Sequence, residues 1–420
     1  MLFRLRSGRL LEFAAYGSPL APVAAANGNV INILYHHGWP SCRHEGAFLH
    51  PLGQELQLRI LAVNRPGVGR SSFDAASYSF QSIADDVRQL LDGLGLDKVV
   101  FMGTSGGGPY ACACACLLPE RTSALCLVAG MTHTRDAPEL LQGMALSNRL
   151  GFLAINHTPG LLGAAMGAGT AALRLAAALG VGPMRAVGGG GKAIVNDMYG
   201  SRSGGEAAEE DEPVQRSAKD VTVPPAGPAA AAAVAGGAAV AKPSASGAAG
   251  GGGGDSGYGG SGGAGLCRAA LGAGLSAAAT WLMLSAAGFS ATDRAAVAEQ
   301  LRQRPELGAL MSRSGGEVLA QGLTGLWADM RLTSEPWGLP LERITAPTFI
   351  WQGDQDLNVT LAMARHLHDA IPGARGRLRV VHGAGHISLG LDHGREVLRA
   401  LTEHLRGESG QRVGSGEAGG

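Results

Sequence analysis

Short apolar runs alternate with helix-like stretches at both ends of this chain, and this alternation constrains its fold more than any other feature. Apolar runs typical of strands lie at 30–35, 59–63, 99–102 and 124–128, and again at 348–351 and 379–381. Stretches with helical periodicity lie between them, at 46–57, 82–94, 109–118 and 361–370. Strands that alternate with helices usually pair in parallel and carry the helices on both faces. The predicted fold class is therefore α/β, with a mostly parallel central sheet and helices on both of its faces.

The middle of the chain breaks this alternation. Residues 131–340 have a mostly helical pattern, so we expect an inserted helical cap between two parts of the core, 1–130 and 341–406. Within this cap, residues 201–265 contain no Leu, Ile, Met, Phe or Trp. Such a segment buries too little apolar surface to offset the entropy of ordering it. We therefore predict a disordered Gly/Ala-rich insert there, and a disordered tail at 407–420.

The charge balance excludes several classes of partner. Lys+Arg and Asp+Glu each number 34, so the formal net charge is 0, and no basic surface for nucleic acid or for an anionic membrane is indicated. The uncharged stretches 150–173 and 269–292 are long enough to span a membrane, but their small side chains favour helices that pack on a core. No signal-peptide pattern precedes the first pair of strands, which favours a cytoplasmic protein and leaves an organellar location open. The oligomeric state stays open.

The cysteines follow no recognisable disulfide or metal-binding pattern. The chain has 6 of them, and Cys112, Cys114 and Cys116 alternate in a run that matches no zinc-ligand spacing. We interpret these three as small buried side chains of a helix. The cysteines therefore indicate no metal site, and the chemistry that we predict for this chain requires no metal and no organic cofactor.

The sharpest chemical motif follows the third apolar run. Residues 103–107, GTSGG, match G-x-S-x-G, a strand-to-helix turn that exposes a nucleophilic serine. Because glycine makes up 67 of the 420 residues, chance matches are expected, and a second copy does occur at 259–263. Only the first copy has an apolar run before it and a helical run after it. Ser105 is therefore the candidate nucleophile, and Ser261 is not.

A serine nucleophile needs a base, and the base needs an acid that orients it. In a parallel sheet with helices on both faces, functional residues gather beyond the carboxyl ends of the strands. Asp354 and Asp356 follow one late strand, and His382 and His386 follow the next. His386 lies on the loop beyond the strand end, so we predict that it is the base. Either aspartate could be the acid on these grounds.

A tetrahedral intermediate also needs N–H donors for its oxyanion. We expect one donor to be the backbone N–H of Gly106, directly after the candidate nucleophile. The other donor is expected in the loop HHGWP at 36–40, through the backbone N–H of Trp39, because Pro40 has no N–H. The Trp39 side chain is also a candidate for the lining of an acyl pocket.

Together these motifs resemble the α/β-hydrolase fold superfamily, and within it the abhydrolase-1 type of small serine hydrolases with a helical cap. The resemblance covers residues 1–131 and 336–406. It rests on HHGWPSCRHEG at 36–46, NRPGVGRSS at 64–72, GTSGGGPYACACA at 103–115, PWGLPLERITAPTFIWQGDQDLNV at 336–359 and VHGAGHISL at 381–389. Members usually carry G-x-x-D after the late strand, with a valine three residues on. Gly353, Asp356 and Val359 occupy these places, so the resemblance implies that Asp356 is the acid.

Two positions set this chain apart from some of its relatives. Asn64 stands where many members have an aspartate before Arg-Pro-Gly. Dehalogenases and epoxide hydrolases of this fold carry an aspartate at the turn where this chain has Ser105. Their mechanism, through an ester of that aspartate, is therefore not expected.

The motifs and the resemblance predict a serine hydrolase that acts on a small-molecule ester-like or other acyl substrate. Ser105, His386 and Asp356 would work through a covalent acyl-enzyme. Two alternatives stay open: the same three residues serve C–C bond hydrolysis or acyl transfer in this fold, and a non-catalytic ligand receptor can keep all three. The shape of the cap pocket would separate the first alternative from ester hydrolysis.

Overall fold

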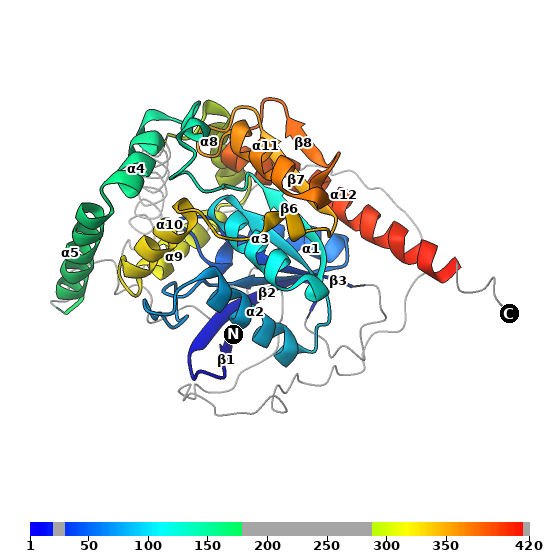
Figure 1. The fold of residues 1–420 in the computed structure, drawn as a ribbon, viewed down its shortest axis with the longest axis horizontal. Helices are drawn as coiled ribbons and strands as arrows, with labels where there is room; N and C mark the ends of the chain where they lie inside the picture. Colours follow the sequence, from blue (N-terminus) through cyan, green and yellow to red (C-terminus); the bar gives the residue numbers. More distant parts are fainter. Residues whose placement is uncertain (20–29, 179–287, 415–420) are drawn as a thin grey trace, which may run out of the picture.

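The computed structural model describes residues 1–19, 30–178 and 288–414. Within them, eight strands form one sheet in the order β1-β2-β4-β3-β5-β6-β7-β8 (Figure 1). β2 is antiparallel to both of its neighbours, and all other neighbouring strands pair in parallel. The strands are β1 (Leu2–Arg4), β2 (Leu10–Gly17), β3 (Ile31–His36), β4 (Leu58–Val63), β5 (Val99–Thr104), β6 (Thr122–Val128), β7 (Thr348–Gly353) and β8 (Leu378–Val381). The predicted α/β class, with a mostly parallel sheet, is confirmed.

Helices cover both faces of the sheet because the side chains of its buried strands alternate between the faces. In β5, Val99 and Phe101 pack in one apolar cluster, which includes side chains of α2, α3 and α11. Val100 and Met102 pack in a second cluster, which includes side chains of α12. α1 also packs on the second face. The helices on the two faces are α1 (His50–Glu55), α2 (Phe80–Leu94), α3 (Gly108–Leu117), α11 (Leu361–Ala370) and α12 (His386–Gly414). Cys112, on α3, is fully buried in the first cluster, as predicted.

Two boundaries differ from the prediction. Where one helix was expected over 46–57, a 3-10 helix spans Arg43–Leu49 and α1 begins only at His50. Pro51 has no N–H and fits the first turn of a helix, which explains why a new helix begins there. At the other end, α12 runs to Gly414, although a disordered tail was predicted from 407. Extending an existing helix costs less free energy than starting one, so the helix continues into residues of weak propensity.

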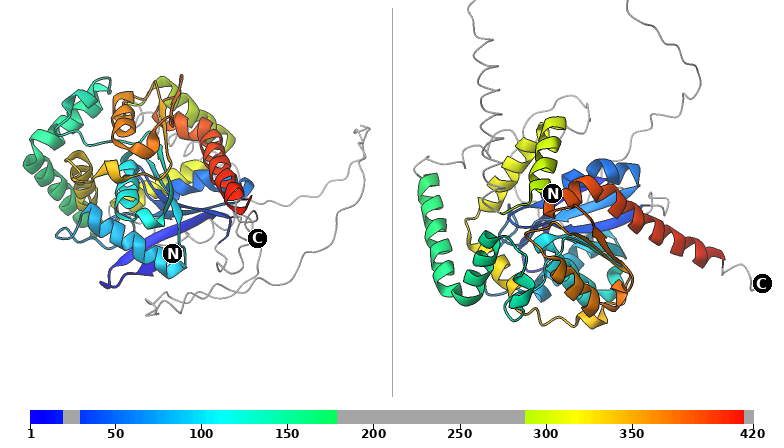
Figure 2. Two further views of the ribbon diagram at one scale, coloured as in Figure 1. Left: turned by 45° about the vertical axis from the view of Figure 1, so that its right-hand side comes forward. Right: turned by 90° about the horizontal axis from the view of Figure 1, so that it is seen from above.

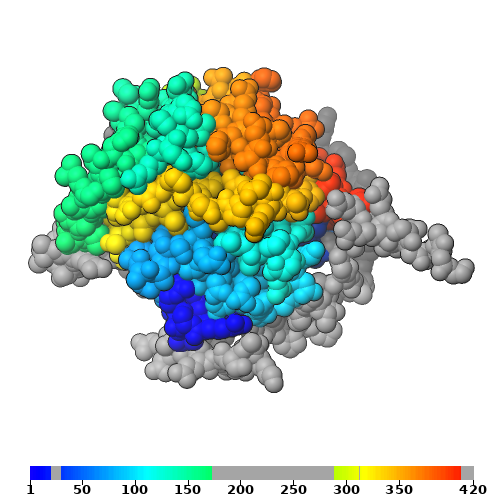
Figure 3. Space-filling model, in the orientation of Figure 1, coloured from blue at the N-terminus to red at the C-terminus, as the bar shows by residue number. Residues whose placement is uncertain are grey.

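Residues 131–340 contribute five described helices, which we call the helical segment. They are α4 (Leu146–His157), α5 (Pro159–Ala178), α8 (Ala291–Gln303), α9 (Glu306–Leu319) and α10 (Thr324–Ser334). α4, α5, α9 and α10 lie together on one side of the sheet (Figures 1 and 2), and α10 packs on both α4 and α5. Figure 3 shows the yellow surface of this part of the chain between the green of α4 and α5 and the blue of the first hundred residues.

Two sequence predictions fall wholly or mostly outside the described residues. The expected insert at 201–265, with the second G-x-S-x-G motif, lies outside them, as does most of the uncharged stretch 269–292. The other uncharged stretch, 150–173, is divided between α4 and α5. Among the described residues, no helix has the length and the apolar character that crossing a bilayer requires.

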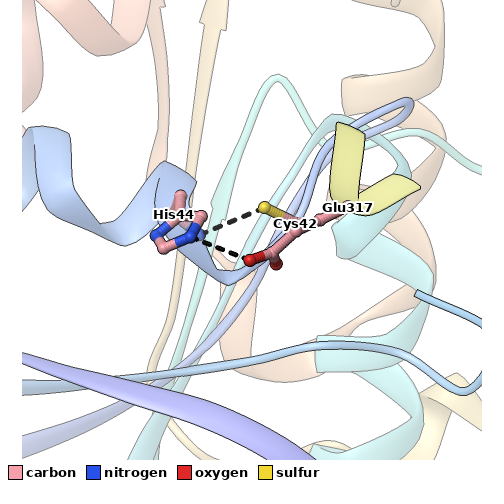
Figure 4. Close-up of side chains that lie close together, drawn as sticks. All are labelled: Cys42, His44 and Glu317. Carbon is pink, nitrogen blue, oxygen red and sulfur yellow. Dashed lines mark hydrogen bonds and ion pairs between the residues drawn. The ribbon is translucent and has the colours of Figure 1, made fainter. Parts of the chain in front are cut away.

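A cluster of charged side chains joins α9 of the helical segment to the core. Glu317, on α9, is ion-paired with Arg43 and lies 3.0 Å from the Nε2 atom of His44 (Figure 4). Arg43 is also paired with Glu12 of β2, at 3.0 Å. Burial alone would raise the pKa of Glu317, but the hydrogen bond from His44 and the charge of Arg43 lower it to about 2. The helical segment is therefore held to the core by a charged carboxylate at neutral pH.

Asn64 lies between the two carboxylates of this cluster. Its Nδ2 atom donates to Glu12 Oε2 at 2.9 Å and to Glu317 Oε2 at 3.3 Å. Its Oδ1 atom accepts from the backbone N–H of Arg43 at 2.6 Å. An aspartate at this position, as in many members of the family that the motifs resemble, would place a third carboxylate against the other two. The neutral amide of Asn64 can therefore donate hydrogen bonds to both carboxylates without adding a negative charge.

We expect Asn64→Asp to lower the free energy of unfolding at pH 7 by about 2 kcal/mol, the cost of losing two buried hydrogen bonds and adding a like charge. Urea denaturation would measure it. The double variant Asn64→Asp/Glu317→Gln should recover part of the loss, because it removes one of the two repelling carboxylates.

Asn32→Asp is a matched control for this prediction. The Oδ1 atom of Asn32 accepts from Arg59 at 3.1 Å, so a carboxylate there still faces a cation. It should leave the unfolding free energy nearly unchanged. Equal stability of Asn64→Asp and Asn32→Asp would contradict our account of the cluster.

Candidate active site

The strand-to-helix turn around Ser105 has the geometry that its motif predicts. β5 ends at Thr104, Ser105 begins a single 3-10 turn, and α3 follows from Gly108. Ser105 has a φ of 54°, a left-handed conformation that is strained for a residue with a side chain. This backbone is compatible only with glycine two residues away on either side. A Cβ at Gly103 would lie 2.5 Å from the Gly107 carbonyl oxygen, and a Cβ at Gly107 would lie 2.1 Å from that of His36.

The structure brings together the three residues predicted to form a catalytic triad. The Nε2 atom of His386 lies 2.9 Å from Ser105 Oγ, and its Nδ1 atom lies 2.8 Å from Asp356 Oδ2. With the proton on Nδ1, the imidazole donates to the carboxylate and accepts from the serine hydroxyl. The side chains of His386 and Asp356 are 10% and 0% exposed, so this chain of hydrogen bonds is shielded from water.

The competing aspartate and histidine form a separate pair. The Nδ1 atom of His382 lies 2.9 Å from Asp354 Oδ2, and the His382 side chain is 89% exposed. This pair therefore lies at the surface, while Asp356 and His386 point towards Ser105. The assignment of Asp356 that rested on the resemblance is the one that the distances favour.

Local hydrogen bonds hold the Asp356 carboxylate in place. Its Oδ1 atom accepts from the backbone N–H groups of Asn358, at 2.8 Å, and Val359, at 2.9 Å. Its Oδ2 atom accepts from the Gln352 side chain at 3.0 Å, and Gln352 also donates to the Val359 carbonyl at 2.8 Å. Gln352 lies in β7, one residue before Gly353. Gln352 was not predicted from the sequence. Its position directly before the G-x-x-D motif is the signal that could have identified it.

Three carboxylates raise the pKa of the candidate base, His386. Burial alone would lower the pKa of His386, but the charge and hydrogen bond of Asp356 raise it, as do the charges of Asp293 and Glu45. The net effect is a pKa above the ordinary value of histidine. Two of these carboxylates, Asp293 and Glu45, were not singled out from the sequence.

The loop after β3 lies close to the serine. A Cβ at Gly38 would lie 3.2 Å from Ser105 Cβ, and a Cβ at Gly106 would lie 2.1 Å from the indole nitrogen of Trp39. The backbone N–H of Gly38 donates to Glu45 Oε2 at 3.1 Å. Because Gly38 is engaged in this way and Pro40 has no N–H, Trp39 is the donor from this loop that fits an oxyanion site best. Gly106 supplies the other backbone N–H next to the serine.

A buried ion pair supports the same loop. Arg65 donates to the carbonyl oxygens of His37 and Gly38, the latter at 3.0 Å, and its Nε atom donates to Asp329 Oδ2 at 2.7 Å. Tyr110 donates to the other oxygen of Asp329 at 2.6 Å. Asp329 belongs to α10. Arg65 therefore links this helix of the helical segment to the loop that contains the candidate oxyanion donor. Arg65 lies in the NRPGVG motif, but its partner more than two hundred residues away has no sequence signal.

One group among the described residues has side chains whose metal-ligating atoms lie close together. Cys42, His44 and Glu317 offer ligand atoms within 4.8 Å of one another (Figure 4). Glu317 is already paired with Arg43, and burial raises the pKa of the Cys42 thiol to about 12. The charges of this region balance without a further cation, since Glu12 is paired with Arg43 and Arg70. We therefore interpret the group as part of the contact between α9 and the core.

Comparison with known proteins agrees with this architecture. Residues 31–220 match the family model of the alpha/beta hydrolase fold. This chain has the α/β-hydrolase fold. The resemblance in fold stated from its motifs is confirmed.

Curated relatives match this chain over short stretches. A stretch of 89 residues is 34% identical to the soluble epoxide hydrolase of Corynebacterium sp. (strain C12), covering 21% of this chain and 30% of that protein. Another, of 91 residues, is 32% identical to bifunctional epoxide hydrolase 2 of Sus scrofa, covering 21% of this chain and 16% of that protein. These matches span less than a third of either relative's length.

Solved structures of other proteins are also similar to this chain. The enol-lactonase from Burkholderia xenovorans LB400 matches with a TM-score of 0.48 and 15% identity, covering 97% of this chain and 100% of that one. At this identity the likeness concerns the fold alone.

We expect Gly107→Ala to lower the free energy of unfolding by about 3 kcal/mol, because the new Cβ would overlap the backbone of His36, which cannot move without disturbing β3. Gly151→Ala is its control. Gly151 lies inside α4, and a Cβ there would have no neighbour within 4 Å. The control should raise stability by about 0.5–1 kcal/mol, since alanine favours the helix. Thermal unfolding of the two variants would measure the difference, and similar melting temperatures would refute the packing argument.

Proposed function

We propose that this protein is a serine hydrolase that cleaves an ester-like or other acyl bond of a small molecule. The observation that carries the proposal is the chain of hydrogen bonds from Ser105 through His386 to Asp356, at 2.9 and 2.8 Å. A serine hydroxyl becomes nucleophilic when a positioned base accepts its proton, and the base works best when an acid holds the productive tautomer.

In the proposed mechanism, Ser105 Oγ attacks the carbonyl carbon of the substrate while His386 Nε2 takes the hydroxyl proton. The imidazolium is stabilised by Asp356, and the oxyanion accepts hydrogen bonds from the backbone N–H groups of Trp39 and Gly106. Collapse of the tetrahedral intermediate breaks the bond to the leaving group, which receives the proton from His386. Water then attacks the acyl-enzyme, with His386 again as base, and releases the acid and free Ser105.

The nature of the nucleophile favours acyl substrates over epoxides. The epoxide hydrolases among the relatives are similar in sequence to this chain, but enzymes of that kind in this fold use an aspartate at the turn. Because this chain has Ser105 at the turn, it lacks the carboxylate nucleophile that would open an epoxide by forming an ester. A serine with a neighbouring base and N–H donors is suited to a carbonyl carbon.

A fluorophosphonate probe should label the native protein at Ser105, because the activated hydroxyl attacks phosphorus as it would attack a carbonyl. Ser105→Ala should abolish the labelling. Ser261→Ala is the matched control, since Ser261 has the same local motif without an apolar run before it in the sequence, and it should label like the wild type. Mass spectrometry of the labelled peptide would identify the site. A folded wild-type protein that resists the probe would refute the proposal.

The hydrolysis rate should fall at acidic pH, because protonated His386 cannot accept the serine proton. Since the pKa of His386 is raised above its ordinary value of 6.5, the midpoint of the acidic limb of kcat/KM should lie above pH 6.5. Asp356→Asn removes the largest raising influence and leaves the imidazole without its acceptor. It should move the midpoint to lower pH and reduce kcat on the order of a thousandfold.

Asp354→Asn is the control for this pH dependence. Asp354 lies two residues away and pairs with the exposed His382, so its loss should change neither the midpoint nor kcat. The rate of hydrolysis of a p-nitrophenyl ester, followed from about pH 5 to 9 to span the titration of histidine, would give the midpoint and kcat of both variants. An equal effect of the two substitutions would contradict the role given to Asp356.

A further inference from the structure

Helix α12 begins at the candidate base itself. His386 is its first residue, so the orientation of the imidazole depends on how the first turn of α12 is held. The N–H groups of a first turn have no acceptor within their own helix and need one from elsewhere. In this structure the acceptor comes from a different part of the chain.

That acceptor is Asp293, on α8 of the helical segment. Its Oδ1 atom accepts from the backbone N–H of Ile387 at 2.7 Å and from that of Ser388 at 2.9 Å. The Ser388 hydroxyl lies 3.2 Å from the same oxygen and also accepts from the backbone N–H of Gly385 at 2.7 Å. One carboxylate oxygen thus ties together the two residues that follow His386.

The same carboxylate is itself fixed. Asp293 is fully buried, and its Oδ2 atom accepts from the hydroxyl of Ser290 at 2.7 Å and from its backbone N–H at 3.2 Å. The approach to the histidine loop is close, because a Cβ at Gly385 would lie 2.3 Å from Ser290 Oγ and 2.5 Å from both carboxylate oxygens. Phe289 packs beside the imidazole, with the ring centroids 6.0 Å apart.

Asp293 also places a negative charge behind the base. Burial alone would raise its pKa, but hydrogen bonds from Ser388, Ser290 and Ile387 lower it, so the carboxylate is ionised at neutral pH. A negative charge at a helix N-terminus is favourable, because it meets the positive end of the helix dipole. The charged groups that face His386 are then Asp356 after β7, Asp293 on α8 and Glu45 on the 3-10 helix after β3.

We propose that Asp293 is a positioning residue for His386, and that α8 of the helical segment is thereby a working part of the site. Asp293 does not touch the reacting atoms. It fixes the first turn of α12, so that Nε2 meets Ser105 while Nδ1 meets Asp356, and its charge stabilises the imidazolium that forms when the serine proton is taken. This role rests on the proposed serine-hydrolase function.

Asp293→Asn is the test variant, since it keeps the shape and one acceptor oxygen but removes the charge. We expect kcat to fall about 10- to 100-fold with little change in KM, because a misplaced base slows the chemical step rather than substrate binding. The midpoint of the acidic limb should move to lower pH, because loss of a nearby negative charge lowers the pKa of His386.

Asp86→Asn is the matched control. Asp86 is also buried and ion-paired, with Arg9, but it lies on α2 away from the site. It should lower the melting temperature without moving the pH midpoint. A role of Asp293 in stability alone would give the same pattern as Asp86→Asn, and that result would overturn the proposal.

Ser388→Ala keeps the proposal testable if Asp293→Asn does not fold. This variant leaves the Asp293 charge in place but removes the hydroxyl that links the first turn of α12 to Gly385 and Asp293. We expect a lower kcat with an unchanged pH midpoint, and an unchanged kcat would overturn the proposal.

Fluorophosphonate labelling of the wild-type protein separates the two levels of inference. If the folded wild type is not labelled, the proposed function fails and the role of Asp293 fails with it. If the wild type is labelled and Asp293→Asn is labelled at the same rate over the whole pH range, the function stands and only the role of Asp293 is overturned.

Discussion

The rest of the site depends on close backbone contacts at the carboxyl edge of the sheet, where the turn at Ser105 lies against the end of β3. Ser105 can hold its left-handed conformation only because Gly107 lets the turn lie against the His36 carbonyl. The same kind of contact occurs at Gly353, where a Cβ would lie 2.2 Å from the Ala384 carbonyl oxygen. The first contact holds the serine turn against the end of β3, and the second holds the end of β7, which precedes the acid, against the loop that precedes the base. Side chains then complete a geometry that the backbone has already prepared.

The helical segment reaches this edge through three carboxylates, each from a different helix. Glu317 of α9 meets Arg43, Asp329 of α10 meets Arg65, and Asp293 of α8 meets the first turn of α12. A buried carboxylate is costly unless its hydrogen bonds are satisfied, so each contact is demanding in geometry. The three together define how the helical segment lies on the sheet more sharply than apolar packing alone would.

Much of the fold and the core of the site could be predicted from the sequence, because the signals are local. The alternation of strands and helices predicted the sheet, and the apolar run before Ser105, with the helical pattern after it, separated this residue from Ser261. Asp354 and Asp356 could not be separated by position alone, since both follow the same strand. The resemblance favoured Asp356, and the distances agree.

The supporting residues could not be predicted, for a physical reason. Asp293 and Asp329 act through contacts with residues distant in the chain, and nothing in their own neighbourhood indicates these distant partners. The 3-10 helix at Arg43–Leu49 was missed because its composition also fits an α-helix. Glu45, which lies in that helix, acts on His386 only because the fold brings the loop after β3 and the start of α12 together near Ser105.

The chain order of the sheet has a consequence for the nascent protein. β6 ends at Val128, and its second neighbour, β7, begins only at Thr348. At ribosomal rates on the order of 10 residues per second, the first six strands wait tens of seconds with β6 as an open edge, a surface prone to wrong pairing. Ser105 is present throughout that interval, but its partners arrive with the last strands and α12. The proposed chemistry is therefore silent until synthesis is nearly complete, and a nascent chain arrested before His386 would carry the serine turn without a base.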